Sequence, residues 1–224
     1  MVAALRDGGY VSSLADPDVW MKPQVKANGD KYWQYVLCYV DDLLVISHDP
    51  KQAMAYLGSR FTLKEGSVKE PDVFLGAEIK KWNLNDPNNP TKTRWAMSSD
   101  LYVKCALADV EKELADVHKK LHSKVTTPMT QSNRVELDTT PELDAKRANY
   151  YQGLIGTLRW MCELGRLDIL VNVAMLSRYL AAPREGHLEQ VFHIFGYLKS
   201  HGRSALVFDD TKPFFAEDRF KKCD

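Results

Sequence analysis

Two adjacent carboxylates, in the string Tyr-Val-Asp-Asp at residues 39–42, are the side chains most suited to chemistry in this chain. Apolar runs flank them at residues 35–38 and 43–46. Because strand interiors avoid Asp, the pair is expected in the turn of a β-hairpin. Two close carboxylates repel each other, and a divalent cation removes that repulsion. The pattern predicts a Mg²⁺ site with Asp41 and Asp42 as ligands; the alternative is an ordinary Asp-Asp turn.

Several predicted strands and one helix position this hairpin. Asn28-Gly29 is a strong turn signal, so residues 18–22 and 31–39 are expected to be neighbouring strands. Asp49 followed by Pro50 predicts the start of a helix. A short strand is expected at residues 62–65. A second hairpin is expected from strands at residues 73–82 and 94–98, joined by a polar loop at residues 83–93.

Helical spacing of apolar residues dominates after about Ser98. Helices are expected around residues 103–114, 142–163 and 184–200, with a polar linker at residues 131–141 and a last strand at residues 206–208. Asp168 is expected to cap one further helix that ends before Pro183. Gly153 and Gly156 share one side of their helix, which would let a partner backbone approach closely. The chain is therefore predicted to be α+β, with a sheet-based part followed by a helical part.

The composition limits the possible partners. The 224 residues are 45% hydrophobic and carry 30 Lys plus Arg against 30 Asp plus Glu, so any grip on nucleic acid is expected to be local. The widely spaced cysteines favour buried thiols over a disulfide framework or a zinc site: Cys38, Cys105, Cys162 and Cys223. No segment is apolar for long enough to span a membrane, and the N-terminus is not a signal peptide.

The histidines and lysines near residue 120 offer weaker signals. His118 and His122 have the spacing of a helical metal pair, but without a third ligand a solvated face is expected. Four basic residues there would suit duplex phosphates, although nearby acidic residues favour an ordinary solvated helix: Lys119, Lys120, Lys124 and Arg134.

The Tyr-Val-Asp-Asp string between apolar runs resembles the active-site hairpin of reverse transcriptases. Downstream, residues 74–79 resemble the primer-grip strand of copia-type LTR retrotransposon polymerases, and residues 124–129 resemble the linker after the first thumb helix. Residues 150–180 and 187–208 resemble the stretches that follow, in the family's order. The resemblance implies a partial palm over residues 1–98, an all-helical thumb or connection region over residues 99–203, and a tether over residues 204–224 toward an RNase H domain.

The same resemblance implies roles in two-metal nucleotidyl transfer, with two Mg²⁺ ions in the complete enzyme. Asp41 would be the principal metal ligand of the turn, Asp42 would assist it, and Tyr39 would pack beneath the primer end. Lys64 would help to protonate the departing pyrophosphate; the alternative is a solvated lysine at the end of a strand.

Four further residues are implied as nucleic-acid contacts: Phe74, Leu75, Gly76 and Trp95. The first three would place backbone against the primer, with simple core packing as the alternative. Trp95 would stack on a sugar or base, and a core role is its alternative.

The implied partners are an RNA or DNA primer–template, dNTP and the rest of a polyprotein (fingers, RNase H and integrase), with no membrane. The implied location is intracellular, in the cytoplasm or within a virus-like particle. The fingers and the other palm carboxylate are expected to be missing, so the isolated chain is expected to be inactive. Two other hypotheses stay open: a decayed fragment that binds duplex or another chain, and a host-recruited interaction domain. Because the hairpin strands are apolar on both faces, the chain is expected to associate.

Overall fold

The computed structural model describes residues 1–84, 91–130 and 134–208, and its contacts divide the chain into two compact units. Unit 1 is Met1–Leu75 and unit 2 is Gly76–Asp224. The boundary lies before the second hairpin rather than at Ser98, so this hairpin groups with the helices. One reason is that the Ser98 hydroxyl donates to the Ser204 carbonyl at 3.0 Å, which fastens the hairpin to the end of the helical region. Most of the expected 83–93 loop and of the 204–224 tether lies outside the described residues.

Unit 1 is built on an antiparallel sheet in which the strands follow chain order, β1-β2-β3-β4. The strands are β1 (Val11–Ser12), β2 (Val19–Val25), β3 (Lys31–Tyr39) and β4 (Asp42–Ile46). Gly29, with φ of 89°, lies in the turn between β2 and β3, as its sequence predicts. The hairpin that the acidic pair predicts is present and is formed by β3 and β4.

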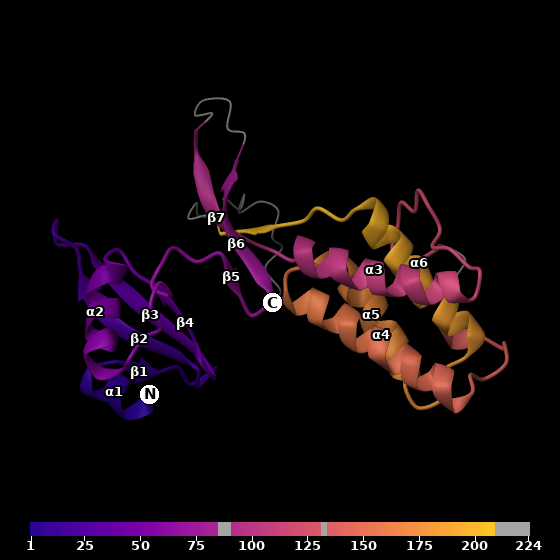
Figure 1. The fold of residues 1–224 in the computed structure, drawn as a ribbon, viewed down its shortest axis with the longest axis horizontal. Helices are drawn as coiled ribbons and strands as arrows, with labels where there is room; N and C mark the ends of the chain where they lie inside the picture. Colours follow the sequence, from indigo (N-terminus) through magenta and orange to yellow (C-terminus); the bar gives the residue numbers. More distant parts are fainter. Residues whose placement is uncertain (85–90, 131–133, 209–224) are drawn as a thin grey trace, which may run out of the picture. The chain divides into compact units, whose positions relative to one another are not determined.

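One face of this sheet is covered by α1 (Val2–Asp7) and α2 (Pro50–Arg60), as Figure 1 shows. Asp49 caps α2 because its carboxylate accepts the amide of Gln52 at 3.3 Å. The core of the unit joins both helices to the strands through Leu5, Tyr10, Trp20, Val36 and Leu57. The short elements α1 and β1 had no sequence signal of their own.

The segment after α2 corrects two strand predictions. Residues 62–65 form no strand, because the chain turns there: the amide of Ser67 donates to the Lys64 carbonyl at 3.0 Å, and Gly66 has φ of 72°. The strand predicted for residues 73–82 is interrupted after β5 (Val73–Phe74) and resumes as β6 (Ala77–Asn83). Leu75 and Gly76, with φ of 52° and 84°, break it, since strands need negative φ. The stretch that resembles a primer-grip strand therefore contains a two-residue turn.

Unit 2 contains the second hairpin, in which β6 pairs with β7 (Thr93–Ser98), and β7 also pairs with β8 (Leu206–Val207). Its long helices are α3 (Asp100–Asp116), α4 (Ala145–Glu163) and α6 (Glu185–Ser200), with the shorter α5 (Leu170–Leu176). The predicted hairpin, helices and last strand are confirmed. Helix α4 begins three residues later than expected because the Asp144 carboxylate caps it, accepting the amide of Arg147 at 2.8 Å. The described part of the linker includes the 3₁₀ turn Val135–Leu137.

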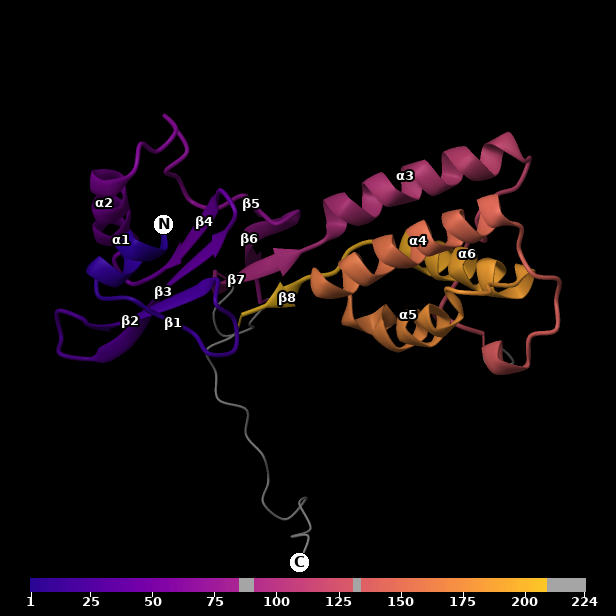
Figure 2. The same ribbon diagram turned by 90° about the horizontal axis from the view of Figure 1, so that it is seen from below.

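The three long helices lie side by side in both Figure 1 and Figure 2, around a single apolar core. Val110 of α3, Leu158 of α4 and Phe195 of α6 are each at most 2% exposed. Within the described residues, no helix is long and apolar enough to cross a membrane.

Asp168 does not cap a helix, contrary to the prediction, because its side chain is taken by tertiary partners. Its carboxylate accepts two hydrogen bonds from Arg166, at 2.9 and 2.7 Å, and one from the Tyr197 hydroxyl at 3.0 Å. Arg166 is buried, with 1% of its side chain exposed. Burial alone would raise the pKa of Asp168, but these hydrogen bonds and the charge of Arg166 outweigh it, so the pKa lies below its usual range.

The close backbone approach predicted at two glycines of α4 is found at a glycine of α6 instead. Added Cβ atoms at Gly153 and Gly156 would meet nothing within 4 Å, so no described backbone segment of this chain makes the predicted close approach to them. At Gly196 a Cβ would lie 2.9 Å from the carbonyl oxygen of His122. The close backbone approach in this unit is therefore at Gly196, between α6 and the loop that follows α3.

Gly196→Ala is expected to destabilise unit 2 by about 1–3 kcal/mol, because the loop backbone must shift to admit the methyl group. Gly156→Ala is the matched control: the methyl enters open space, and Ala favours a helix over Gly by about 1 kcal/mol, so stability should rise. Chemical denaturation of both variants measures the difference. Equal effects of the two substitutions would contradict the close approach at Gly196.

The cysteine prediction is partly wrong. Cys38 is half-buried, Cys162 is buried and Cys105 is exposed, and all three are free thiols; Cys223 lies outside the described residues. Burial raises the pKa of Cys162 to about 11, so this thiol is protonated and unreactive near neutral pH.

Candidate metal site at the hairpin tip

The β3–β4 hairpin ends in a turn of two residues. Tyr39 pairs with Asp42 as the last pair of the ladder, which leaves Val40 and Asp41 as the turn. Val40 has φ of 50° and is 85% exposed. A β-branched residue is an outlier in this left-handed region, where tight hairpins normally place Asn, Asp or Gly. The turn is therefore strained, and such strain is typical of functional sites rather than of ordinary turns.

The carboxylates of this turn are exposed and unpaired. Within the described part of the chain, neither Asp41 nor Asp42 takes part in an ion pair. Nothing inside unit 1 therefore neutralises two adjacent negative charges that a four-stranded sheet holds in place. Carboxylate oxygens that are accessible and rigidly presented fit Mg²⁺, which binds through one or two carboxylates and keeps several waters. Among the described residues, no group of three or more His, Cys, Asp or Glu forms a complete metal site.

The hairpin also lies at an open edge. Because the sheet order ends with β4, the outer edge of β4 carries no partner strand among the described residues. Asp18 lies near the same end of the sheet, since its carbonyl accepts the amide of Cys38 at 2.9 Å. The sequence alone does not locate Asp18, because only the register of β2 against β3 brings it to this end of the sheet.

The sheet face opposite α1 and α2 is apolar and has no buried residue. Strand alternation and register place on it ten uncharged residues of the three longer strands: Val19, Met21, Pro23, Val25, Trp33, Tyr35, Leu37, Tyr39, Leu44 and Ile46. Two charged residues, Lys31 and Asp42, lie at the ends of the same face. Trp33, Tyr39 and Ile46 are each about half exposed, at 53%, 49% and 52%. The helices of unit 1 thus cover only one of the two apolar faces.

We expect the chain to self-associate and to bind a hydrophobic dye through this face, since contiguous apolar patches of this extent are rare on monomers. The double variant Trp33→Lys and Ile46→Lys should lower both dye fluorescence and apparent size in gel filtration, because both side chains lie on that face. A wild-type chain that elutes as a monomer and leaves the dye dark would show that the face is covered.

The other predicted site residues are divided between the two units. Lys64 is exposed in the turn after α2 and belongs to unit 1, and no described carboxylate pairs with it. Phe74 and Leu75 end unit 1, whereas Gly76 begins unit 2. An added Cβ at Gly76 would lie 3.7 Å from the indole nitrogen of Trp160.

Trp95 lies on β7 in unit 2 and is 37% exposed. It belongs to neither core, so the alternative of a core role is wrong. The Lys81 ammonium lies 5.2 Å from the centre of its ring, in a cation–π contact. An exposed indole beside a cation remains compatible with stacking on a base, which stays a prediction.

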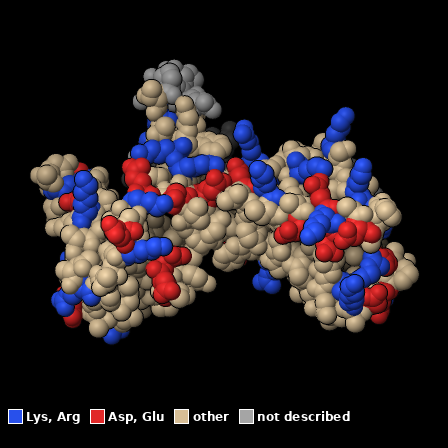
Figure 3. All heavy atoms as spheres, viewed as in Figure 1, with Lys and Arg blue, Asp and Glu red and all other residues tan. Residues whose placement is uncertain are grey.

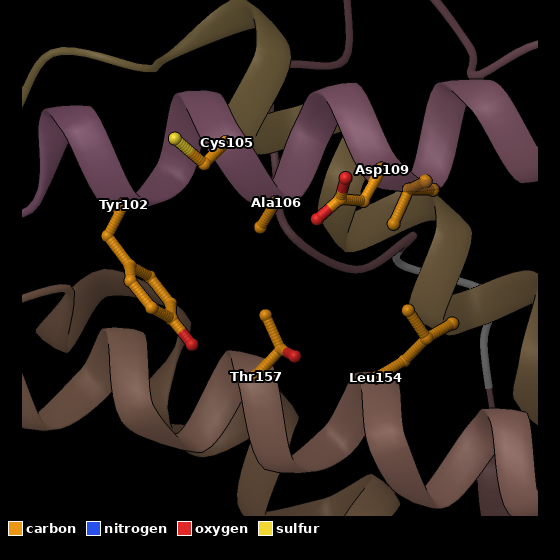
Figure 4. Close-up of a pocket in the computed structure, with 7 residues that line it drawn as sticks. Tyr102, Cys105, Ala106, Asp109, Leu154 and Thr157 are labelled. Carbon is orange, nitrogen blue, oxygen red and sulfur yellow. The ribbon is translucent and has the colours of Figure 1, made fainter.

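Described residues of unit 2 line two hollows that the sequence did not indicate. Figure 4 shows the smaller, a gap of about 170 Å³ between α3 and α4 with Tyr102, Asp109 and Thr157 among its lining residues. The larger, about 450 Å³, lies between the loop after α3 and helix α6; we call it the α6 hollow, and its lining is His122, Lys124, Val125, Thr126, Thr127, Thr130 and His193. Helix α3 ends at Asp116, so His118 and His122 do not form the helical metal pair considered from their spacing.

Charges of both signs are interspersed over the face of the molecule that Figure 3 shows, and neither sign forms a continuous stripe there. This agrees with the equal numbers of basic and acidic residues. Contacts with nucleic acid would therefore have to rest on local features rather than on a broad basic field.

Val40→Asn is expected to stabilise unit 1 by about 1 kcal/mol, because Asn tolerates the left-handed conformation that Val resists. Val68→Asn is the control, since Val68 is an exposed valine without a positive φ and its replacement should change stability by less than about 0.5 kcal/mol. Thermal or urea unfolding gives both values. A destabilised Val40→Asn variant would mean that the turn carries no strain.

Comparison with known proteins relates the chain to transposon polyproteins. It is 28% identical over 193 residues to the retrovirus-related Pol polyprotein from transposon RE1 of Arabidopsis thaliana, an alignment that covers 85% of this chain and 11% of that protein. It is 30% identical over 168 residues to the putative transposon Ty5-1 protein of Saccharomyces cerevisiae, covering 73% of this chain and 48% of that protein.

A third relative is the retrovirus-related Pol polyprotein from transposon TNT 1-94 of Nicotiana tabacum, 24% identical over 208 residues, or 91% of this chain and 14% of that protein. The homologues of this chain are copia-type retrotransposon Pol polyproteins. The chain spans less than half of the length of each of these three relatives. No protein-family model matches the chain, and no solved structure matches it.

Proposed function

We propose that this chain is a segment of a retrotransposon RNA-directed DNA polymerase and that the β3–β4 turn forms part of its Mg²⁺ site. The observation that carries the proposal is a strained two-residue turn with two exposed, unpaired carboxylates at the hairpin tip, Asp41 in the turn and Asp42 at the start of β4. An ordinary hairpin turn has no need of either feature. Similarity to Pol polyproteins over most of the chain supports the proposal.

Asp41 and Asp42 would hold Mg²⁺ through their carboxylate oxygens, with Asp41 as the principal ligand. The ions would activate the primer hydroxyl and neutralise the charge of the leaving pyrophosphate. Tyr39 precedes the turn and pairs with Asp42, so its half-exposed ring would form an apolar floor for the primer end next to the carboxylates. The turn remains rigid because the β3 ladder fixes it on one side and α2 supports the sheet from behind.

The remaining ligand of the site would come from another segment of the polyprotein. The open edge of β4 would accept an additional strand there, because its outer backbone groups have no partner among the described residues. Primer–template and dNTP are the proposed substrates, and the rest of the polyprotein (fingers, RNase H and integrase) is the proposed partner. The proposed location is accordingly intracellular, in the cytoplasm or within a virus-like particle.

Lesser roles are proposed for residues away from the turn. Lys64, exposed and free of a described ion pair, would supply a proton to pyrophosphate. Phe74, Leu75 and Gly76 would bring the turn between β5 and β6 against the primer backbone, and Trp95 would stack on a sugar or base.

The second candidate function is a non-catalytic module that binds primer–template duplex or another chain. It is favoured because no group of three or more His, Cys, Asp or Glu among the described residues is arranged to hold a metal ion. Under this alternative the exposed Trp95 and the apolar sheet face would serve binding alone.

Primer extension on an RNA template separates these possibilities. The isolated chain is expected to bind a primer–template duplex at low salt without extending it. A chimera in which the chain replaces the aligned segment of the RE1 Pol polyprotein is expected to extend primers in the presence of Mg²⁺. A folded chimera that binds duplex but never extends it would support the non-catalytic module, and a chain without affinity for nucleic acid would point to an interaction domain.

A further inference from the structure

The α6 hollow is formed by a loop that is fixed firmly against helix α6. The Nε2–H of His193 donates to the Thr127 carbonyl at 3.0 Å, and the amide of Val125 donates to the Ser200 hydroxyl at 3.2 Å. Gly196 lets the loop backbone come close to α6 between these two hydrogen bonds. The hollow is therefore pre-formed rather than a gap under a loose loop, which lowers the entropic cost of binding.

The hollow is lined by several hydrogen-bond donors, and no carboxylate lies among them to neutralise the lysine. One ammonium, two imidazoles and three hydroxyl groups line it, and no carboxylate is among its lining residues. His193 and Thr127 already donate to backbone carbonyls, of Thr127 and Met129, so the donors offered to a ligand are Lys124, His122 and the hydroxyls of Thr126 and Thr130. Glu189, one turn before His193 on α6, is not part of the lining. Among the described residues, no carboxylate forms an ion pair with Lys124 or His122. The whole chain has equal numbers of basic and acidic residues, whereas the lining of this hollow includes a basic residue and no acidic one.

Lys124 is held in a backbone conformation that its type disfavours, with φ of 61°. A non-glycine residue in this region costs about 1–3 kcal/mol and persists where the surrounding structure fixes it. The chain is held on both sides of Lys124: the His122 carbonyl packs closely against Gly196 before it, and Val125 and Thr127 make the two hydrogen bonds to α6 after it. The strain thus coincides with the charged residue of the hollow.

We propose that the α6 hollow binds a phosphate group. Phosphate oxygens accept hydrogen bonds from ammonium, imidazole and hydroxyl donors, and a lysine supplies the point charge that such sites use. A metal cation is disfavoured, because the Lys124 ammonium would repel it. The volume of about 450 Å³ exceeds what a free ion needs and accommodates a phosphate that is part of a nucleotide or of a nucleic-acid backbone. The inference shares no residue with the hairpin and does not depend on catalysis.

Histidine ring signals in NMR spectra test the site on the whole chain. Three probes are titrated separately: inorganic phosphate, adenosine 5′-monophosphate, and a 5′-hydroxyl oligonucleotide whose phosphates are all internal. We expect saturable shifts of His122 and His193, while His48 in unit 1 stays unchanged. Binding of the monophosphate alone would identify a terminal phosphate as the ligand, and binding of the oligonucleotide as well would identify the backbone; both results support the site.

Lys124→Gln is expected to weaken phosphate binding by about fivefold or more, whereas Lys119→Gln, which removes an exposed charge outside the lining, should change it by less than about twofold. Equal losses in the two variants, or shifts spread over all histidines, would show diffuse attraction and overturn the proposal. Absence of saturable binding to all three probes would overturn it as well. Asp41→Asn should leave phosphate binding intact, so failure of this site and failure of the proposed polymerase function are distinguishable.

Discussion

Asp41→Asn is expected to lower Mg²⁺-dependent primer extension by the chimeric polymerase by about a thousandfold or more, equivalent to about 4 kcal/mol of transition-state stabilisation. The reason is that Asn keeps the shape of the side chain but removes the charged oxygen that would bind the metal. Asp42→Asn should cost less, since Asp42 is assigned the assisting role. Extension is measured on a primed RNA template with and without Mg²⁺.

Stability should not change in parallel with this loss. Asp41 is exposed and unpaired, so the variant is expected to unfold at the wild-type denaturant concentration. Glu65→Gln is the matched control, because Glu65 is another exposed carboxylate of unit 1 that lies outside the hairpin. Full extension by Asp41→Asn, or an equal loss in Glu65→Gln, would remove the hairpin from the active site.

Asp168→Asn is expected to destabilise unit 2 by about 2–4 kcal/mol, the largest stability effect that we expect from an isosteric change. The substitution leaves the Arg166 guanidinium buried without its counter-charge, and the Nη1 of Arg166 already has no hydrogen-bond partner in the described structure. The estimate is kept below that for a fully buried pair because the Asp168 side chain is 36% exposed and partly screened. Urea unfolding gives the free energy.

Arg134 and Glu136 provide the control, since they are also two residues apart but lie on the surface, 3.6 Å from each other with side chains 73% and 47% exposed. Glu136→Gln should cost less than about 0.5 kcal/mol. If the two substitutions have the same effect, burial of Arg166 contributes nothing to stability.

The Asp168 contribution should also depend on pH. Its pKa is lowered in the folded state, so the carboxylate stabilises the fold fully above the pKa of the unfolded chain and progressively less as pH falls through the folded-state pKa. The difference in unfolding free energy between wild type and Asp168→Asn should therefore shrink in acid. A difference that stays constant from neutral pH to strongly acidic pH would contradict this linkage.

The sequence predicted those features that depend on local pattern. An acidic pair between two apolar runs has few options other than a hairpin turn, and β3–β4 forms it. The periodic apolar residues of α3 and α6 likewise predicted their helices within one or two residues at most ends.

The wrong predictions concern residues whose local structure is determined by partners distant in the sequence or by an unusual backbone conformation. Asp168 has the local signal of a helix cap, but Arg166 and Tyr197 bind it, and the second of these lies 29 residues away. Leu75 gives no hint in the sequence of the positive φ that breaks the predicted strand. The α6 hollow was missed because its members come from a loop and a helix that only tertiary packing brings together.

The most direct test of the metal site uses Mn²⁺ as a paramagnetic substitute for Mg²⁺, since both prefer oxygen ligands. The isolated chain is titrated to millimolar Mn²⁺ while the backbone amide signals are followed by NMR. We predict that the signals of Val40, Asp41 and Asp42 broaden first, and that this broadening disappears in the Asp41→Asn, Asp42→Asn double variant but persists in Glu65→Gln. Broadening that begins at other carboxylates, or that survives the double substitution, would contradict a metal site at the tip of this hairpin.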